Sequence, residues 1–320
     1  MKMTKMLAAA AVALSLSAAH AEPVDVMKIM VPANPGGGFD TVGRALGEAL
    51  TAAGQAKRVQ VENKAGAGGA IGLAQFVNNA KADPNSLFIA GIVTVGAIEA
   101  NKPPVSLDMV TPVARLMGEY NVIVVPANSP YKTLKDLTDA VKANPGAVSV
   151  GGGSAGGVDH IMMGLVAKAI GVPPAKINYV PYAGGGEGKA MILGGHIAAY
   201  VSGYGELADV IKGGKLRALA LSSDKRLDGV DIPTMKEQGI DVVLFNWRAV
   251  FAEPKLSAEQ TKAVTAMVDA AVHNEAWKTK AQKLEWIDLH QDGDAFRNFL
   301  AEEQKRVAAI IPELGLAKQP

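Results

Sequence analysis

Residues 27–53 read MKIMVPANPGGGFDTVGRALGEALTAA, and this stretch decides the fold class. The apolar run from Met27 to Pro32 predicts a strand, and Asp40 to Ala53 carries apolar residues at helical spacing. The glycines between them predict a tight turn. A strand that leads through a glycine-rich turn into a helix is the repeating unit of α/β proteins, so this stretch predicts an α/β fold.

The same alternation continues along the rest of the chain. Further strands are predicted at 58–62, 87–92, 120–125, 148–150, 177–180 and 216–221. Further helices are predicted after the second strand through about Asn79, and at 132–143, 160–170, 257–272 and 296–310. A length of 320 residues predicts two domains. Because no Pro/Ser-rich linker separates them, we expect the chain to cross between domains on strands near 120–125 and 216–222. The predicted domains are 22–122 plus 222–320, and 123–221.

The composition excludes several classes of protein. The chain has no cysteine, which excludes disulfides, cysteine-ligated metals and a thiol nucleophile. The formal net charge is +1 and only 5% of the residues are aromatic, which argues against a nucleic-acid binder. What remains is a glycine-rich globular protein that handles a small molecule.

The first 21 residues are typical of a secretory signal peptide. Lys2 and Lys5 precede an apolar stretch from Met6 to Leu16, and the A-x-A sequence of residues 19–21 supplies a cleavage site. The apolar stretch is shorter than the roughly 20 residues that span a bilayer. We therefore expect a periplasmic protein. Cleavage removes two lysines and no acid, so that 30 basic residues face 31 acidic ones and the net charge becomes −1.

Four glycine-rich segments each follow a predicted strand and precede a helix. Ligands of open α/β sheets bind beyond the carboxyl ends of the strands, and backbone N–H groups at a helix N-terminus attract anions. Several such turns meeting in one cleft predict a site for a small anion. The segments are residues 34–40 (NPGGGFD), 63–69 (NKAGAGG), 151–157 (GGGSAGG) and 182–188 (YAGGGEG).

The third of these segments also matches two motifs that are typical of other protein classes. Gly151-x-Gly153-x-x-Gly156 matches a dinucleotide fingerprint, but no acid follows at the expected distance, and no Walker A sequence occurs. Gly152-x-Ser154-x-Gly156 matches the nucleophile elbow of serine hydrolases. Asp209 or Asp231, with His273 or His290, would complete a triad in chain order. A secreted hydrolase that uses Ser154 is therefore the alternative hypothesis.

The histidines show no spacing typical of a metal site. Neither H-x-x-x-H nor H-E-x-x-H occurs among the five histidines. Asp159-His160 is more typical of a helix start than of a ligand set. The sequence therefore predicts no metal and no cofactor.

Seven segments in order along the chain carry a family resemblance: 31–40, 61–72, His160, 182–186, 214–220, 232–239 and 246–248. Together they resemble the substrate-binding proteins of tripartite tricarboxylate transporters, also called Bug-type receptors. The resemblance covers essentially the whole mature chain.

This resemblance implies a periplasmic binding protein of the Venus-flytrap type, with parallel-type sheets and strand crossovers between its two domains. It implies a receptor rather than an enzyme, which closes on a small carboxylate and docks to the membrane permease subunits of a tripartite transporter. We expect a monomer. Citrate is the first expected ligand and a C4 dicarboxylate the second.

The resemblance also implies a set of ligand-binding residues. In this chain Gly152 and Gly157 stand where the family often has serine, and Trp247-Arg248 stands where Trp-Gly is usual. Both changes resemble the branch associated with citrate-like ligands. The expected residues are Pro35, Gly36, Gly37, Gly38, Phe39, Asp40, Thr94 at the end of the third strand, Gly152, Gly153, Ser154, His160, Tyr182, Gly184, Gly185, Ser202, Trp247 and Arg248.

Arg248 carries the most specific expectation about the ligand. A guanidinium presents a planar fork that suits a carboxylate. One hypothesis is that Arg248 holds a second or third carboxylate of the ligand. The other is that Arg248 lies on the surface and stacks on Trp247.

Overall fold

The computed structural model describes residues 22–182 and 185–316, so the predicted signal peptide lies outside the described residues. Strands and helices alternate in these residues as predicted. The strands are β1 (Met27–Val31), β2 (Val59–Asn63), β3 (Ser86–Gly91), β4 (Thr111–Pro126), β5 (Ser149–Gly152), β6 (Asn178–Pro181), β7 (Ala199–Gly203), β8 (Leu216–Leu221), β9 (Phe245–Ala252) and β10 (Ile287–Asp292). The α-helices are α1 (Gly38–Ala52), α2 (Ala70–Asn78), α3 (Ile92–Asn101), α4 (Leu134–Ala143), α5 (Val158–Ala169), α6 (Gly185–Leu193), α7 (Tyr204–Lys212), α8 (Ala258–Val272), α9 (Glu275–Lys283) and α10 (Gly293–Glu313).

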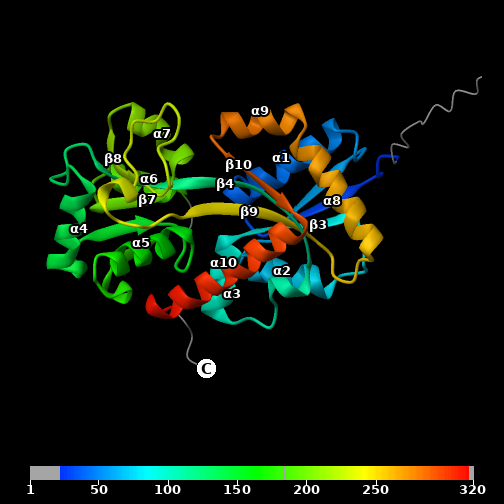
Figure 1. The fold of residues 1–320 in the computed structure, drawn as a ribbon, viewed down its shortest axis with the longest axis horizontal. Helices are drawn as coiled ribbons and strands as arrows, with labels where there is room; N and C mark the ends of the chain where they lie inside the picture. Colours follow the sequence, from blue (N-terminus) through cyan, green and yellow to red (C-terminus); the bar gives the residue numbers. More distant parts are fainter. Residues whose placement is uncertain (1–21, 183–184, 317–320) are drawn as a thin grey trace, which may run out of the picture.

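One long strand joins the two ends of the molecule. β4 has 16 residues and changes partners along its length: Thr111–Tyr120 pairs with β9, whereas Asn121–Pro126 pairs with β7 and β8. Figure 1 shows β4 and β9 running along the long axis, with α4 to α7 gathered at one end and α1, α2, α8 and α9 at the other. The partner change lies inside the segment predicted to cross between domains. The exact domain boundaries stay a prediction.

The sheet is mixed in direction. Its order is β2-β1-β3-β9-β4-β7-β5-β6, with β8 and β10 also paired to β4. The outer pairs β1–β2, β1–β3, β5–β6 and β5–β7 are parallel, as expected, whereas all pairs made by β4 and β9 are antiparallel. The antiparallel pairs arise because the chain crosses on β4 and returns on β9 beside it. The structure confirms the α/β class and restricts parallel pairing to the outer strands.

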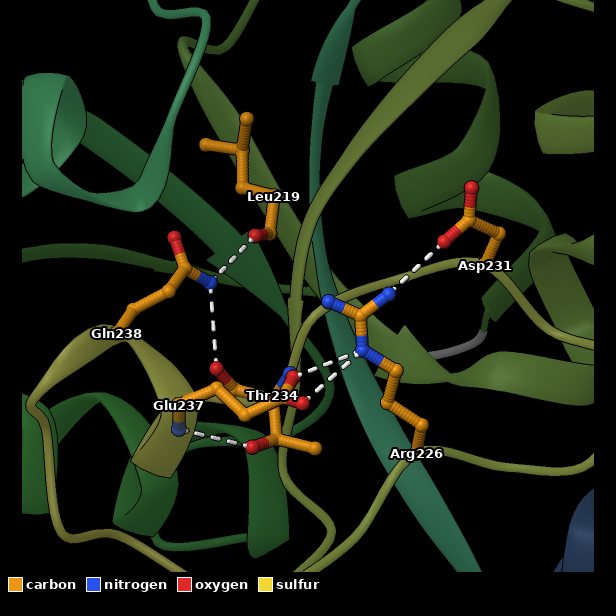
Figure 2. A network of polar contacts seen from close by, with 6 residues as sticks. All are labelled: Leu219, Arg226, Asp231, Thr234, Glu237 and Gln238. Carbon is orange, nitrogen blue, oxygen red and sulfur yellow. Dashed lines mark hydrogen bonds and ion pairs between the residues drawn. The ribbon is translucent and has the colours of Figure 1, made fainter.

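The return path from β8 to β9 is held by polar contacts rather than by regular structure. Ser222 receives a hydrogen bond from Asn121 N and donates to Leu244 O, which joins the start and end of the segment to β4. Figure 2 shows Arg226 contacting both Asp231 and Glu237, at 2.8 and 3.0 Å. These ion pairs lie within the segment itself, and Gln238 Nε2 joins it to β8 by donating to Leu219 O at 2.9 Å.

The parallel strands direct their carboxyl ends toward the middle of the molecule. β1, β3, β5, β6 and β7 are each followed by a helix, namely α1, α3, α5, α6 and α7. The helix N-termini therefore gather where β4 changes partners, which is the position at which α/β sheets bind ligands. Among the described helices, none has the length and apolar content that crossing a bilayer requires.

Candidate functional site

The first glycine-rich loop is shaped by the carboxylate of Asp40. Its Oδ2 accepts from Gly36 N and from Arg44 Nε, both at 2.8 Å, and its Oδ1 accepts from Asn63 Nδ2 at 2.9 Å. Burial by itself raises the pKa of Asp40, but the hydrogen bonds from Arg44, Gly36 and Asn63 outweigh it and lower the pKa. Asp40 therefore stays ionised and positions the loop.

Three backbone N–H groups remain at the start of α1. Gly36 N–H donates to Asp40 and Gly37 N–H to Asn34 O, so both are used within the loop. The first intrahelical bond runs from Thr41 N to Gly37 O. The N–H groups of residues 38–40 precede it and have no partner in their own helix. They form the positive end of α1, which attracts anions.

The guanidinium of Arg248 lies directly against this helix end. A Cβ on Gly38 would stand 2.4 Å from Arg248 Nη2, so only glycine lets the guanidinium approach so closely. Arg248 Cζ lies 4.6 Å from the centre of the Phe39 ring, and Nη2 donates to Glu119 Oε1 at 3.2 Å. Arg248 is only 6% exposed and stacks on Phe39. It is therefore neither a surface residue nor a cover for Trp247.

Glu119 connects Arg248 to the other end of the molecule. Its Oε1 also accepts from Asn246 Nδ2 at 3.1 Å, and its Oε2 would lie 2.7 Å from a Cβ on Gly203 at the end of β7. Ser202, directly before Gly203, donates from its Oγ to Glu206 Oε2 at 2.7 Å. The same Oε2 would lie 2.6 Å from a Cβ on Gly185 at the start of α6.

The loop after β5 is held by the residues that follow it. Asp159 accepts from Gly153 N at 2.7 Å and from Asn121 Nδ2 at 2.5 Å. His160 Nδ1 accepts from Gly156 N at 3.3 Å, and its ring stacks on Tyr179 at 4.0 Å. Burial lowers the pKa of His160 to about 4, so the ring is neutral and can accept this bond. His160 therefore acts on the loop conformation.

We call Glu119, Asp159, Glu206 and Arg248 together the junction. Burial raises the pKa of Glu119, although Arg248 opposes the effect. Burial also raises the pKa of Asp159 to about 7, and the charges of Glu206 and Glu119 add to the increase although Gly153 N–H opposes it. Within the junction, Arg248 pairs directly with Glu119, whereas Glu206 acts on Glu119 and Asp159 through its charge.

Two buried amides beside the junction have an acceptor atom to spare. Asn121 and Asn246 each donate to one of its carboxylates, and their Oδ1 atoms accept no hydrogen bond from the described residues. Buried polar atoms are normally hydrogen-bonded, so these two oxygens favour a ligand hydroxyl or a water as donor.

Thr94 lies within α3 and not at the end of the third strand, because that helix begins at Ile92 directly after β3. Its buried Oγ1 would stand 3.0 Å from a Cβ on Gly69, which belongs to the second glycine-rich segment. Two residues further along α3, a Cβ on Gly96 would stand 2.1 Å from Gly156 O. The second and third glycine-rich segments therefore meet at α3.

Six of the predicted residues each lie against a member of the junction, namely Gly38, Phe39, Gly152, Gly153, Gly185 and Ser202. Trp247 is fully buried on the opposite face of β9, where its Nε1 donates to Glu303 Oε2 at 2.8 Å and its ring packs edge-on against Phe299. It belongs to the packing against α10. Gly184 lies outside the described residues. Tyr182 is buried beside Gly151.

The three acids of the junction are not among the site residues predicted from the sequence. Glu119 and Arg115 are the two charged residues among the largely apolar residues of β4, and a charge in such a strand indicates a buried partner. The sequence around Asp159 predicts only the start of a helix. Glu206 lies on the exposed side of α7 and gave no signal.

The geometry does not assemble the alternative triad. Ser154 is exposed on the loop after β5. His273 and His290 lie beside each other at the end of α8 and on β10, with ring centres 5.4 Å apart, and both face Asp269. Asp209 pairs with Lys189, and Asp231 pairs with Arg226.

A family model, a curated relative and a solved structure of similar sequence all point to the same receptor family. The model of the tripartite tricarboxylate transporter family receptor matches residues 42–316. Protein BugT of Bordetella pertussis is 29% identical over 331 residues, which cover 98% of this chain and 99% of that protein. A TctC solute-binding protein from Polaromonas has 27% identity and a TM-score of 0.75, covering 91% of this chain and 99% of the other. MatC from Rhodopseudomonas palustris, solved with bound malate, has 23% identity and a TM-score of 0.76, covering 90% and 99%; at that identity it shows the shared fold.

Proposed function

The chain belongs to the tripartite tricarboxylate transporter receptor family, and from that premise we propose that it is a periplasmic receptor for a small di- or tricarboxylate. In this proposal the ligand binds between the two predicted domains. Cleavage after residue 21 releases the receptor into the periplasm. The loaded receptor then delivers its ligand to the permease subunits of a tripartite transporter. Citrate is the first candidate and a C4 dicarboxylate such as malate, the ligand of MatC, the second.

One observation carries this proposal. The N–H groups at the start of α1 and the guanidinium of Arg248 meet at Gly38, where the approach is closer than any side chain would allow. A helix N-terminus contributes about 0.3–1 kcal/mol toward an anion, and a hydrogen bond to a charged group about 1.5–3 kcal/mol. The combination supports a subsite for one carboxylate.

The acids of the junction should make the affinity for a carboxylate depend on pH. An anion placed near Glu119 and Asp159 disfavours their ionised forms. Because the pKa of Asp159 is already about 7 without ligand, anion binding takes up a proton there. We therefore expect affinity for di- and tricarboxylates to increase as the pH falls from 8 to 6.

A thermal-shift screen of the mature protein, residues 22–320, tests the proposal. The probes are citrate, tricarballylate, malate and succinate at constant ionic strength, each at pH 6 and pH 8. A ligand at 100 times its Kd stabilises by about 2.7 kcal/mol, which raises the Tm of a chain of about 300 residues by roughly 4 °C. Silence toward all four, together with Ser154-dependent labelling by a fluorophosphonate, would favour the hydrolase instead.

Two variants of one ion pair test the role of Arg248. Glu119→Gln removes the charge that neutralises Arg248, and we expect it to strengthen binding of the carboxylate found in the screen. Arg248→Lys keeps the positive charge but loses the planar fork, and we expect it to weaken binding at least tenfold. Equal effects of the two variants would mean that Arg248 only supports the fold.

A further inference from the structure

The last turn of α8 presents an aspartate and a histidine on one face. Asp269 and His273 are four residues apart, and Asp269 Oδ1 lies 3.3 Å from His273 Nδ1. His273 Nδ1 also lies 2.8 Å from the backbone oxygen of Asp269, which holds the ring at the end of the helix. A contact of this kind through one ring nitrogen leaves the other, Nε2 of His273, as the atom that would bind a metal. Because the pair consists of one aspartate and one histidine, it does not match the H-x-x-x-H spacing.

A β-bulge in β10 adds a second histidine to the same place. The pairing of β10 with β4 shifts between Asp288 and Gln291, which leaves Leu289 and His290 opposite a single residue of β4. Leu289 turns toward β4, where its side chain contacts Gly118 and its carbonyl accepts from Arg115 Nε at 2.7 Å. His290 Nδ1 lies 3.8 Å from Asp269 Oδ1. Bulges often redirect side chains in this way at functional sites.

We propose that Asp269, His273 and His290 bind a divalent transition-metal ion, with Zn²⁺ as the best fit. One ligand atom from each residue lies within 4.8 Å of the other two. Ligands at 2.0–2.2 Å from a tetrahedral ion stand about 3.4 Å apart, so small rotations close the site. His273 supplies the freedom to rotate, because its side chain is 62% exposed, whereas His290 at 16% is held by the bulge.

The donor set selects the class of ion. Two imidazoles and one carboxylate suit Zn²⁺, Co²⁺ or Ni²⁺, whereas Ca²⁺ and Mg²⁺ prefer oxygen ligands alone. Three protein ligands leave the fourth position for water. The ion would join the end of α8 to β10 and so close the chain around α9, which lies between them in sequence. This site is distinct from the junction and does not depend on the proposed function.

The test uses the untagged mature protein after EDTA treatment, with Co²⁺ and Zn²⁺ as probes at pH 7.5. We expect one Co²⁺ per chain with the visible absorption of a tetrahedral nitrogen–oxygen site, and displacement of Co²⁺ by Zn²⁺. At 100 times its Kd, Zn²⁺ should raise the Tm by about 4 °C.

Single substitutions then identify the ligands. His273→Gln, His290→Gln and Asp269→Asn should each weaken Co²⁺ binding at least tenfold, whereas the exposed control His196→Gln should leave it unchanged. No stoichiometric binding up to 1 mM, or equal binding by all four variants, would overturn the proposal and leave a hydrogen-bonded cluster only. If a variant does not fold, pre-treating the wild-type histidines with diethyl pyrocarbonate in the presence and absence of Zn²⁺ gives the same answer. Protection of His273 and His290 supports the site, and equal modification with and without Zn²⁺ contradicts it.

Discussion

Replacing Gly38 by alanine should displace the guanidinium of Arg248. The added Cβ would stand 2.4 Å from Nη2 and 3.0 Å from Cζ, whereas carbon atoms in contact lie about 3.5–4.0 Å apart. The guanidinium must therefore retreat by roughly 1 Å. It is held between the Phe39 ring and Glu119, so this movement breaks the 3.2 Å bond to Glu119 Oε1.

The expected cost follows from two opposing effects. Overpacking a buried site costs about 1–3 kcal/mol, and replacing glycine by alanine in a helix returns up to about 1 kcal/mol. The net loss is about 1–2 kcal/mol, which corresponds to roughly 2–3 °C in Tm for a chain of about 300 residues. Gly186→Ala is the matched control, because a Cβ at Gly186 in α6 has no atom within 4 Å. We expect that variant to be neutral or slightly stabilised.

A double-mutant cycle measured by urea unfolding gives the decisive assay. In an Arg248→Ala background the new Cβ has no guanidinium to displace, so Gly38→Ala should become neutral or stabilising. The coupling free energy should therefore exceed about 1 kcal/mol. An equal destabilisation in both backgrounds, with coupling below about 0.5 kcal/mol, would refute the contact.

Two further predictions concern groups buried near β4 and β9. The pKa of Asp159 is raised to about 7, so the native state holds a proton that the unfolded state releases near pH 4; stability should decrease from pH 4 to pH 7 and level off above it. Asp159→Asn should flatten this slope in pH-dependent urea unfolding, and unchanged slopes would show that Asp159 is not the group responsible. Trp247→Phe removes the donor to Glu303 and should cost about 1–3 kcal/mol in unfolding free energy. Ligand affinity in the same variant should stay within twofold of wild type, and a tenfold loss would place Trp247 at the binding site.

The sequence predicted the fold class and the glycine-rich loops because both depend on local pattern. The strand from Met27 and the helix after Gly37 follow from alternation and turn chemistry within about twenty residues. The resemblance rests on the same segments, and the family match covers residues 42–316. The contact of Asp40 with Arg44 also lies within one helical turn. Such features need no knowledge of what packs against them.

The contacts of the proposed site required the tertiary structure, since they join distant parts of the chain. Arg248 and Glu119 are 129 residues apart, and Asn121 and Asp159 are 38 residues apart. The sequence could suggest a carboxylate ligand for Arg248, but not that a glutamate already pairs with it. Nor could it assign Trp247 to the far face of β9.

The sequence by itself thus determined the α/β class, the glycine-rich helix starts and the resemblance to a receptor family. These features depend on residues that are close together in the chain. The tertiary structure alone decided the electrostatics of the junction. The crossing on β4 brings Glu119, Asp159 and Arg248 from separate segments into a buried place. Burial there raises the pKa of both carboxyls, the charge of Glu206 adds to the increase, and Arg248 opposes it at Glu119.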